Sequence, residues 1–305
     1  MTGSERRDEL RNAFESTRAQ LEATNARIEA RAGRNLFFAI LSGLVFGGVF
    51  LASLFLMREV FVGLVAVIVS VALVELAAAF RVSGRRVPRV GVVLGGLVVV
   101  GGAFFWGAEG MLLGLFAGSA LLTVWRLVEG LFPAWETPPR TLVRDVFSGL
   151  FTLVYVAFLA SFAVLLVDGE RGEWWVFALV SIVVSVDVGA YAAGVTLGRT
   201  KMTPRISPNK TWEGFFGAAV LAMAVGVSVA VFALEQPWWV GIILGVVVLF
   251  TATGGDLTES LIKRNLGVKD MSSWIPGHGG FLDRLDSLLP SAVGVYGVAL
   301  VLGVV

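Results

Sequence analysis

Residues 174–197 read WWVFALVSIVVSVDVGAYAAGVTL, and within them Asp187 is the only charged residue. A helix rises about 1.5 Å per residue, so about 20 apolar residues cross the roughly 30 Å hydrocarbon core of a bilayer. The backbone polar groups of such a segment must be satisfied without water, and a helix satisfies them internally. This stretch therefore predicts a transmembrane helix, and it sets the fold class for the rest of the chain.

Eight more apolar blocks of similar length accompany this one in the 305-residue chain. The chain is 56% hydrophobic and 15% charged, with a mean hydropathy of +0.83, whereas about a quarter of the residues in a soluble domain are charged. We therefore expect an all-α integral membrane protein with about nine transmembrane helices, forming a polytopic membrane domain over residues 36–305. The predicted spans lie near residues 36–57, 60–80, 90–106, 110–130, 147–167, 174–197, 213–235, 237–255 and 287–305.

The distribution of positive charge predicts the orientation. If the N-terminus is cytoplasmic and nine spans alternate, every Lys and Arg except Arg58 and Arg171 lies on the cytoplasmic side. Because basic loops are retained on that side, the charges favour nine spans and a cytoplasmic N-terminus in the cell membrane. Residues 1–35 form a polar cytoplasmic tail whose apolar spacing predicts a helix, and a solvated helix near the membrane and a coiled coil both stay open.

Composition excludes several classes of site. The chain has no cysteine, and His278 is its single histidine. Disulfides, thiolate catalysis and metal sites built from several His or Cys ligands are therefore excluded. The net charge of +1 gives no sign of a nucleic-acid partner, and we expect none.

The densest group of charges lies in residues 255–286, GDLTESLIKRNLGVKDMSSWIPGHGGFLDRLD. Carboxylates suit a hard cation such as Mg²⁺, which keeps phosphate oxygens in its shell, and Lys and Arg suit the phosphates themselves. The segment therefore indicates metal-assisted chemistry on phosphate groups, and a solvated charged loop with an ordinary glycine turn is the alternative. Its charged residues and its histidine are Asp256, Glu259, Lys263, Arg264, Lys269, Asp270, His278, Asp283, Arg284 and Asp286.

Helical spacing places some of these side chains on common faces. The eighth span is expected to continue as a helix into this segment, so Asp256, Glu259 and Lys263 share one face. Proline and glycine residues then break the chain, and a helix restarts just before the last span. Asp283 and Asp286 share a face of that second helix. The glycine amides that precede it could meet an anion.

The other polar segment begins with a carboxylate deep in the membrane. Asp187 lies about 20 Å from the outer end of its span. A carboxylate at such depth costs about 2.5–3.5 kcal/mol, so it usually faces a functional cavity. Tyr191 shares its helical face, and Ser207, Lys210 and Thr211 follow in a proline-fixed turn that could hold nucleotide phosphates. A polar partner for Asp187 in a neighbouring span, and a basic loop that only follows the positive-inside bias, are the alternatives.

Other features are explained without function. Glu75, a lone carboxylate near the cytoplasmic end of the second block, is interpreted as structural. Tryptophan pairs at residues 174–175 and 238–239 lie at the outer ends of two spans, where an interfacial aromatic belt accounts for them.

The two polar segments resemble the bacterial-type phosphatidate cytidylyltransferases, or CDP-diacylglycerol synthases. The signature of that family runs Ser-x-x-Lys-Arg, four residues, Lys-Asp, then Pro-x-His-Gly-Gly-x-x-Asp-Arg-x-Asp, and the chain departs from it at no position. The signature is filled by Ser260, Lys263, Arg264, Lys269, Asp270, Pro276, His278, Gly279, Gly280, Asp283, Arg284 and Asp286. The matching region covers roughly residues 185–290, and the first five spans match only in hydropathy.

The resemblance implies an all-helical membrane fold, a homodimer, and a reaction at the cytoplasmic face in which CTP and phosphatidic acid give CDP-diacylglycerol and pyrophosphate. It implies Mg²⁺ as cofactor, bound by carboxylates that correspond to Asp256 and Asp283, and it leaves room for a monovalent cation such as K⁺. The catalytic half of the membrane domain would then be residues 174–305.

Roles for individual residues follow as hypotheses. The candidate metal ligands are Asp256, Asp283 and Asp286. The candidate catalytic residues are Lys263, Arg264, Lys269, Asp270, His278 and Arg284. The candidate substrate-binding residues are Asp187, Tyr191, Ser207, Lys210, Thr211 and Glu259. His278 could orient a phosphate or protonate a leaving oxygen, and a structural role in the turn stays equally open.

Two groups of alternatives remain. A membrane transporter would spread its charges among the spans and carry a repeat, whereas this chain concentrates its charges at one face. A CTP-dependent prenol kinase and a CDP-archaeol synthase share the substrate logic, but the complete signature argues against both. A CDP-alcohol phosphotransferase would need an Asp-Gly-x-x-Ala-Arg motif, and the only Asp-Gly, at residues 168–169, lacks it.

Overall fold

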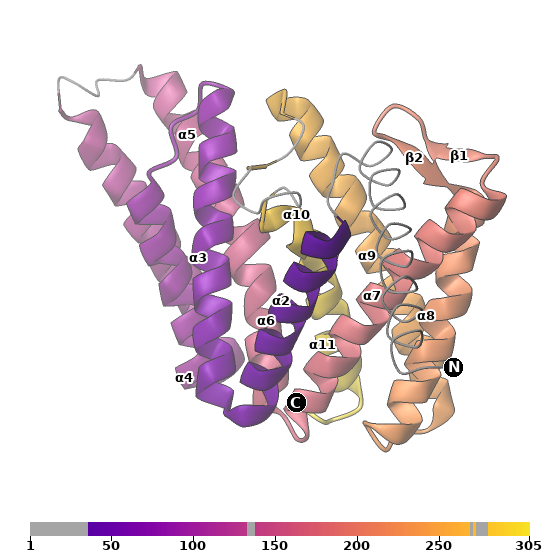
Figure 1. The fold of residues 1–305 in the computed structure, drawn as a ribbon. Helices are drawn as coiled ribbons and strands as arrows, with labels where there is room; N and C mark the ends of the chain where they lie inside the picture. The colour runs from indigo at the N-terminus through magenta and orange to yellow at the C-terminus, as the bar shows by residue number, and fades with distance from the viewer. Residues whose placement is uncertain (1–35, 133–137, 269–270, 273–279) are drawn as a thin grey trace, which may run out of the picture.

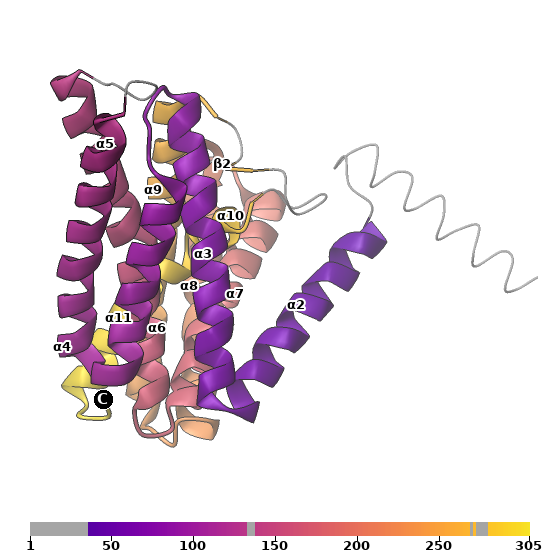
Figure 2. The same cartoon turned by 90° about the vertical axis from the view of Figure 1, so that its left-hand side faces the viewer.

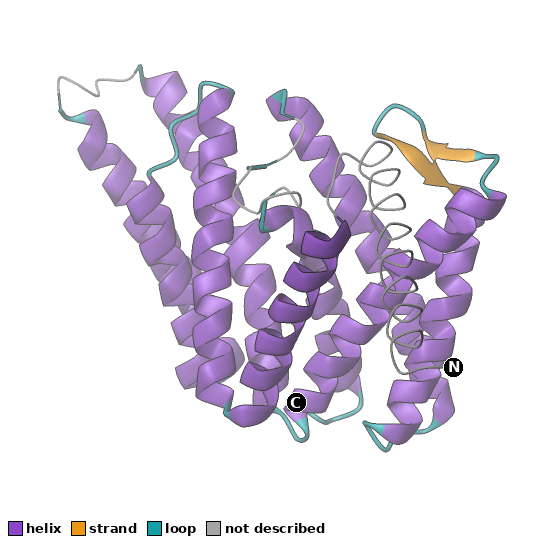
Figure 3. Ribbon diagram, viewed as in Figure 1, coloured by secondary structure: helices purple, strands orange, loops and turns teal. Residues whose placement is uncertain are grey.

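The computed structural model describes residues 36–132, 138–268, 271–272 and 280–305. It is a bundle of helices that carries a small β-hairpin at one end (Figure 1, Figure 3). The predicted tail, residues 1–35, lies outside the described residues. The elements are α2 (Leu36–Leu56), α3 (Arg58–Val82), α4 (Arg89–Gly130), α5 (Pro139–Thr152), the π-helix η2 (Leu153–Phe158), α6 (Leu159–Asp168), α7 (Gly172–Leu197), β1 (Lys201–Thr203), β2 (Ser207–Thr211), α8 (Trp212–Phe232), α9 (Trp238–Leu266), α10 (Leu282–Leu285) and α11 (Leu288–Val301).

Seven helical stretches within the described residues are long and apolar enough to cross a membrane. They are Arg58–Val82, Arg89–Gly130, Pro139–Asp168, Gly172–Leu197, Trp212–Phe232, Trp238–Leu266 and Leu282–Val301. A shorter apolar helical stretch, Val45–Leu56, is the C-terminal part of α2. The helical membrane character expected from the sequence is therefore confirmed.

The element α4 folds back on itself. Its 42 residues would reach about 63 Å as a straight helix, twice the hydrocarbon thickness. The backbone leaves the helical conformation at Trp106 and Gly107, where Gly107 has a φ of 61°. Gly102 precedes this reversal and Gly110 follows it. A Cβ atom on Gly102 would overlap the carbonyl of Gly110, so the two halves of α4 lie against each other. The sequence predicted two blocks here, 90–106 and 110–130, and the reversal falls between them.

Helices α7, α8 and α9 pack against one another over much of their length and lie together in Figure 1. Small residues make this close packing possible, because a Cβ atom on Gly189 would come within 2.9 Å of Ala218 in α8. Glycine at helix crossings lets backbones approach in this way in membrane proteins. The span that holds Asp187 is thereby fixed tightly to its neighbours.

The β-hairpin corrects one prediction. Ser207–Thr211 was expected to form a proline-fixed turn, but it forms strand β2, which pairs antiparallel with β1. Proline is tolerated in a two-stranded sheet because its missing N–H can face away from the partner strand. The carboxylate of Glu213 accepts hydrogen bonds of 3.1 Å from the amides of Arg199 and Thr200, which ties the hairpin to the first turn of α8.

The breaks around the last polar segment fall where the spacing predicted them. Helix α9 runs past the apolar block to Leu266 and ends at Gly267, whose φ of 72° lies in the left-handed region. A new helix, α10, begins at Leu282 and leads into α11. Asp256, Glu259 and Lys263 therefore do lie on one continuous helix.

A buried ion pair joins the N-terminal helices. Arg126 of α4 and Asp145 of α5 are 2.8 Å apart, and both side chains are fully buried. Asp145 lies on a helix that begins earlier than the predicted block of 147–167 and passes through η2 before it ends. Figure 2 shows α3, α4 and α5 side by side at this part of the bundle. The pair fixes the ends of these helices relative to one another.

Candidate active site

A cleft of about 290 Å³ opens between α7, β2, α8 and α9. We call it the α7–α9 cleft. Six residues that the sequence singled out lie in its lining: Asp187, Tyr191, Ser207, Lys210, Thr211 and Asp256. Apolar side chains from the three helices, among them Val186, Phe215 and Ala252, complete the wall. The structure therefore brings the two polar segments of the sequence together in one hollow.

Lys210 and Asp256 form an ion pair across this cleft. Lys210 Nζ lies 2.6 Å from Asp256 Oδ2 and 3.5 Å from the carbonyl oxygen of Thr253. Lys210 lies on strand β2, and Asp256 is the first charged residue of α9 after its apolar part. Both side chains are only partly buried. Because water and ligands can reach them, either partner can be exchanged for a phosphate or a cation.

A second ionic cluster lies where α9 meets α10. Lys263 Nζ is 2.6 Å from Glu259 Oε2 and 2.9 Å from Asp283 Oδ1. Asp283 also accepts hydrogen bonds from the amides of Gly280, at 2.8 Å, and Met271, at 3.4 Å. One lysine therefore bridges two helices, and Asp283 is held by three donors.

Glu259 is placed differently from the other candidates for substrate binding. Its side chain is 2% exposed, and it is absent from the lining of the α7–α9 cleft. Among the described residues its Oε1 atom finds no hydrogen-bond partner. Its position is that of a buried support for Lys263.

Asp286 lies close to the α7–α9 cleft because the turn that follows α10 packs against α9. A Cβ atom on Gly255 would overlap the carbonyl of Asp286, so the two backbones are in direct contact. The Asp286 carboxylate accepts a 2.7 Å hydrogen bond from the amide of Ser287. It also lies within electrostatic range of Asp256 and Asp187. Carboxylates from α7, from α9 and from the turn between α10 and α11 thus lie within electrostatic range of one another near one end of the bundle.

The donor chemistry fits Mg²⁺, although no complete set of protein ligands is assembled. Within the described residues, no three His, Cys, Asp or Glu side chains lie close enough together to hold a metal ion. Asp256 and Asp283 instead form ion pairs with Lys210 and Lys263, respectively. Mg²⁺ binds oxygen ligands and commonly uses one or two carboxylates, with water and substrate phosphates completing its shell. The residues therefore suit an ion that arrives with the nucleotide.

The remaining predicted catalytic residues are spread around this end of the bundle. Arg264 Nε donates a 3.3 Å hydrogen bond to the carbonyl of Ile206, and so joins α9 to the hairpin. Arg284 is exposed on α10. Lys269, Asp270 and His278 lie outside the described residues, so their roles stay predictions.

Glu75 of α3 is a positioning residue whose importance the sequence did not indicate. Its buried carboxylate accepts hydrogen bonds from Ser272 Oγ at 2.5 Å, from the amide of Phe281 at 3.0 Å and from the amide of Leu282 at 2.9 Å. It thereby anchors the start of α10, and with it Asp283. The interpretation of Glu75 as structural agrees with these contacts. Its lone position in an apolar block was the available signal, because such a carboxylate needs partners.

Comparison of the sequence with known proteins identifies its family. The sequence model of the cytidylyltransferase family matches residues 38–302. The chain is 39% identical over 272 residues to a phosphatidate cytidylyltransferase of Mycobacterium bovis, covering 88% of this chain and 89% of that protein. It is 40% identical over 271 residues to the phosphatidate cytidylyltransferase of Mycobacterium leprae, covering 86% and 87%. With the enzyme of that name from Brucella suis it shares 39% over 188 residues, covering 61% and 68%.

Proposed function

The chain belongs to the cytidylyltransferase family and is a nucleotidyltransferase of phospholipid synthesis, and we propose that it joins CTP to phosphatidic acid in the α7–α9 cleft. The observation that carries this proposal is the cleft itself. It brings Asp187, Lys210 and Asp256 together at one end of a bundle of apolar helices. Such a place suits a water-soluble nucleotide that must meet a lipid phosphate. The products are CDP-diacylglycerol and pyrophosphate.

The chemistry asks little of a general base. An oxygen of the phosphatidic acid phosphate attacks the α-phosphorus of CTP, and a new P–O bond forms there. The bond between that phosphorus and the oxygen bridging to the β-phosphate breaks, and pyrophosphate leaves with the electron pair. Because the attacking oxygen is already anionic, the chief obstacle is repulsion between phosphate groups. Fixed cations that face the reacting phosphates offset this repulsion.

The lysines of the two clusters supply those cations. Lys210 lines the cleft beside Ser207 and Thr211, and it is placed to receive the nucleotide phosphates. Lys263 is held between Glu259 and Asp283, and it can serve a phosphate at the α9–α10 end. Both ammonium groups start from a carboxylate partner. Binding of a phosphate therefore exchanges one anion for another around each lysine.

Mg²⁺ is proposed as the cofactor, with Asp256 and Asp283 as its protein ligands and Asp286 in support. When bound, it would offset the negative charge that develops on the leaving pyrophosphate. The all-oxygen donor set supports this choice, because Mg²⁺ prefers hard oxygen ligands. A monovalent cation such as K⁺ beside it stays a prediction.

We also propose nine transmembrane helices with a cytoplasmic N-terminus. Counting the two halves of α4 separately and including α2 gives nine passes. The ends of α3, α7 and α9 that lie at the hairpin end of the bundle are rich in basic residues (Figure 1). The described basic residues in or beside the connections that follow these helices are Arg81, Arg85, Arg86, Arg89, Arg199, Lys201, Arg205, Lys210, Lys263, Arg264 and Arg284. This distribution supports a cytoplasmic hairpin end by the positive-inside rule. We propose further that the protein forms a homodimer, as the family resemblance implies.

The test is to supply the purified protein in detergent micelles with Mg²⁺ and with CTP that is labelled at its α-phosphate. Phosphatidic acid, a prenol and an alcohol acceptor with CDP-diacylglycerol are offered in separate reactions. We expect labelled lipid with phosphatidic acid alone, together with one pyrophosphate released per lipid formed. In a parallel reaction with CTP labelled at its γ-phosphate, transfer of the label to the prenol would favour the kinase alternative. No labelling of any acceptor by protein that keeps its helical content would refute the proposal.

A further inference from the structure

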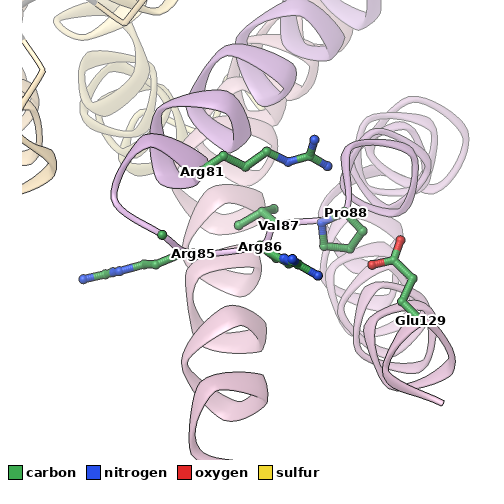
Figure 4. A pocket seen from close by; sticks show the side chains of 7 residues that line it. Arg81, Arg85, Arg86, Val87, Pro88 and Glu129 are labelled. Carbon is green, nitrogen blue, oxygen red and sulfur yellow. The ribbon is translucent and has the colours of Figure 1, made fainter. Parts of the chain in front are cut away.

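A second hollow lies at the same end of the bundle, away from the α7–α9 cleft. It has a volume of about 700 Å³ and lies at the connection between α3 and α4, which residues 83–88 form. Its charged lining residues are Arg81, Arg85, Arg86 and Glu129, and it shares no residue with the α7–α9 cleft. Figure 4 shows Arg81 and Arg86 extending to the side where Pro88 and Glu129 lie, while Arg85 extends the other way.

The connection that carries Arg85 and Arg86, and that follows Arg81 in the last turn of α3, is held firmly. The amide of Arg86 donates a 3.0 Å hydrogen bond to Asp145, which is itself buried in its pair with Arg126. Arg144 donates a 2.9 Å hydrogen bond to the carbonyl of Gly84. Two contacts from α5 therefore fix the backbone at neighbouring positions. The arginine side chains are presented by an ordered connection rather than by a free loop.

Like charges are held together at this site. Arg81 experiences repulsion from Arg86 and Arg89, and among the described residues Glu129 is the carboxylate that offsets it. Arg81 is exposed, and its side chain makes no hydrogen bond or ion pair with any described residue. A fixed arrangement of guanidinium groups suits an anion with several oxygens, because each guanidinium offers planar, paired donors. Phosphate in a lipid headgroup and free phosphate share this chemistry.

An adjoining hollow decides between those two sources. About 640 Å³ in volume, it runs along the second half of α4 and meets the arginine hollow at Glu129. Its other lining residues are Ala120, Leu121, Val124, Trp125, Val128 and Phe132. An anionic head site continued by an apolar groove matches an amphiphile with a phosphate at one end. Basic pockets at the ends of transmembrane helices bind anionic lipid headgroups in this way.

We propose that residues 81–88 and the second half of α4 form a binding site for an anionic phospholipid that is separate from the catalytic cleft. The headgroup phosphate is held by Arg81 and Arg86. One acyl chain lies along the groove at Val124 and Val128. Free phosphate would meet the same guanidinium groups, but it would gain nothing from the groove.

The experiment uses the full chain in detergent micelles and follows bound lipid by native mass spectrometry. Dioleoyl phosphatidylglycerol is titrated beside dioleoyl phosphatidylcholine and soluble glycerol phosphate. Neither lipid is an acceptor in the proposed reaction, so the result is independent of that function. We expect the wild-type protein to retain phosphatidylglycerol at least tenfold better than phosphatidylcholine or glycerol phosphate.

Two variants and one control locate the site. The double variant R81Q/R86Q is expected to bind phosphatidylglycerol about tenfold more weakly, and V124Q, which keeps both arginines, is expected to weaken it severalfold. Arg140→Gln is the matched control, because Arg140 is exposed at the start of α5 and lines neither hollow. Equal binding by all four proteins overturns the proposal. The proposal is also overturned if glycerol phosphate binds as tightly as the lipid. It is overturned as well if V124Q changes from dimer to monomer while lipid binding stays intact, because the groove would then be a contact between subunits.

Discussion

Replacing Glu75 with alanine tests whether α3 positions the catalytic segment. The Glu75 carboxylate accepts three hydrogen bonds, from Ser272, Phe281 and Leu282. Hydrogen bonds to a charged group contribute about 1.5–3 kcal/mol each. In the wild-type protein, part of the stabilisation by these hydrogen bonds is offset by the cost of burying the carboxylate, and the alanine variant does not have this cost. We expect a net loss of about 3 kcal/mol for holding the start of α10 in place.

A loss of that size changes the open population of the segment roughly a hundredfold, because 1.4 kcal/mol is a factor of ten. Hydrogen–deuterium exchange of the peptide that contains Phe281 and Leu282 should therefore quicken by about that factor. Labelled CTP incorporation should fall in parallel, since Asp283 directly follows Leu282. The membrane-inserted amount of protein should be unchanged.

The matched control is Glu59→Ala. Glu59 lies in the same helix as Glu75 but is exposed, so its removal should alter neither exchange nor activity. Glu75→Gln keeps one acceptor oxygen and should give an intermediate exchange rate. If Glu75→Ala exchanged and reacted like the Glu59 control, the positioning role assigned to Glu75 would be wrong.

Three further predictions concern other described residues. Asp283→Asn removes the charge that faces Lys263, so labelled CTP incorporation should fall about a hundredfold while the protein still accumulates in membranes; near-normal activity would exclude Asp283 as a metal ligand. Tyr155→Phe removes a buried hydroxyl that has no partner among the described residues, so unfolding in detergent should cost about 1 kcal/mol more. Arg126→Met leaves Asp145 buried without its charge partner and should cost about 3–5 kcal/mol, much of which the additional change Asp145→Leu should restore.

Local periodicity explains why part of the site could be predicted from the sequence. A helix fixes the spacing of its faces, so Asp256, Glu259 and Lys263 could be grouped before any packing was known. Asp187 was marked by its depth in an apolar block, where a carboxylate needs a reason to be present. Both arguments use only residues within one helix, and the structure agrees with each.

Contacts between distant helices could not be predicted in this way. The Glu75 carboxylate meets the amide of Leu282 across 207 residues of sequence, and no spacing rule links two such positions. The ion pair between Lys210 and Asp256 could not be predicted either, because it depends on how the hairpin folds over α9. The hairpin is not predicted from the sequence, because Pro208 is typical of a turn, whereas the edge of a two-stranded sheet also tolerates it.

The pairing of Lys210 with Asp256 leads to a prediction about the order of binding. One ammonium group, 2.6 Å from its carboxylate, cannot neutralise that carboxylate and a nucleotide phosphate fully at once. If CTP arrives alone, Lys210 turns toward the phosphate and leaves Asp256 facing an anion. If Mg²⁺ arrives as well, it can take over the carboxylate while the lysine serves the nucleotide. CTP should therefore bind at least about tenfold more tightly with Mg²⁺ than with EDTA, a coupling of about 1.4 kcal/mol.

Calorimetric titration of CTP into the protein measures this coupling without any turnover. Lys210→Met should weaken CTP binding under both conditions, while Mg²⁺ should still strengthen it at least about tenfold, because the metal is then the cation that separates the carboxylate of Asp256 from the nucleotide phosphates. Arg140→Gln, at an exposed position outside the cleft, should leave both affinities unchanged. Equal CTP affinity with Mg²⁺ and with EDTA in the wild-type protein would show that the carboxylates and the nucleotide do not share an ion. The assignment of Asp256 and Asp283 as Mg²⁺ ligands would then be wrong.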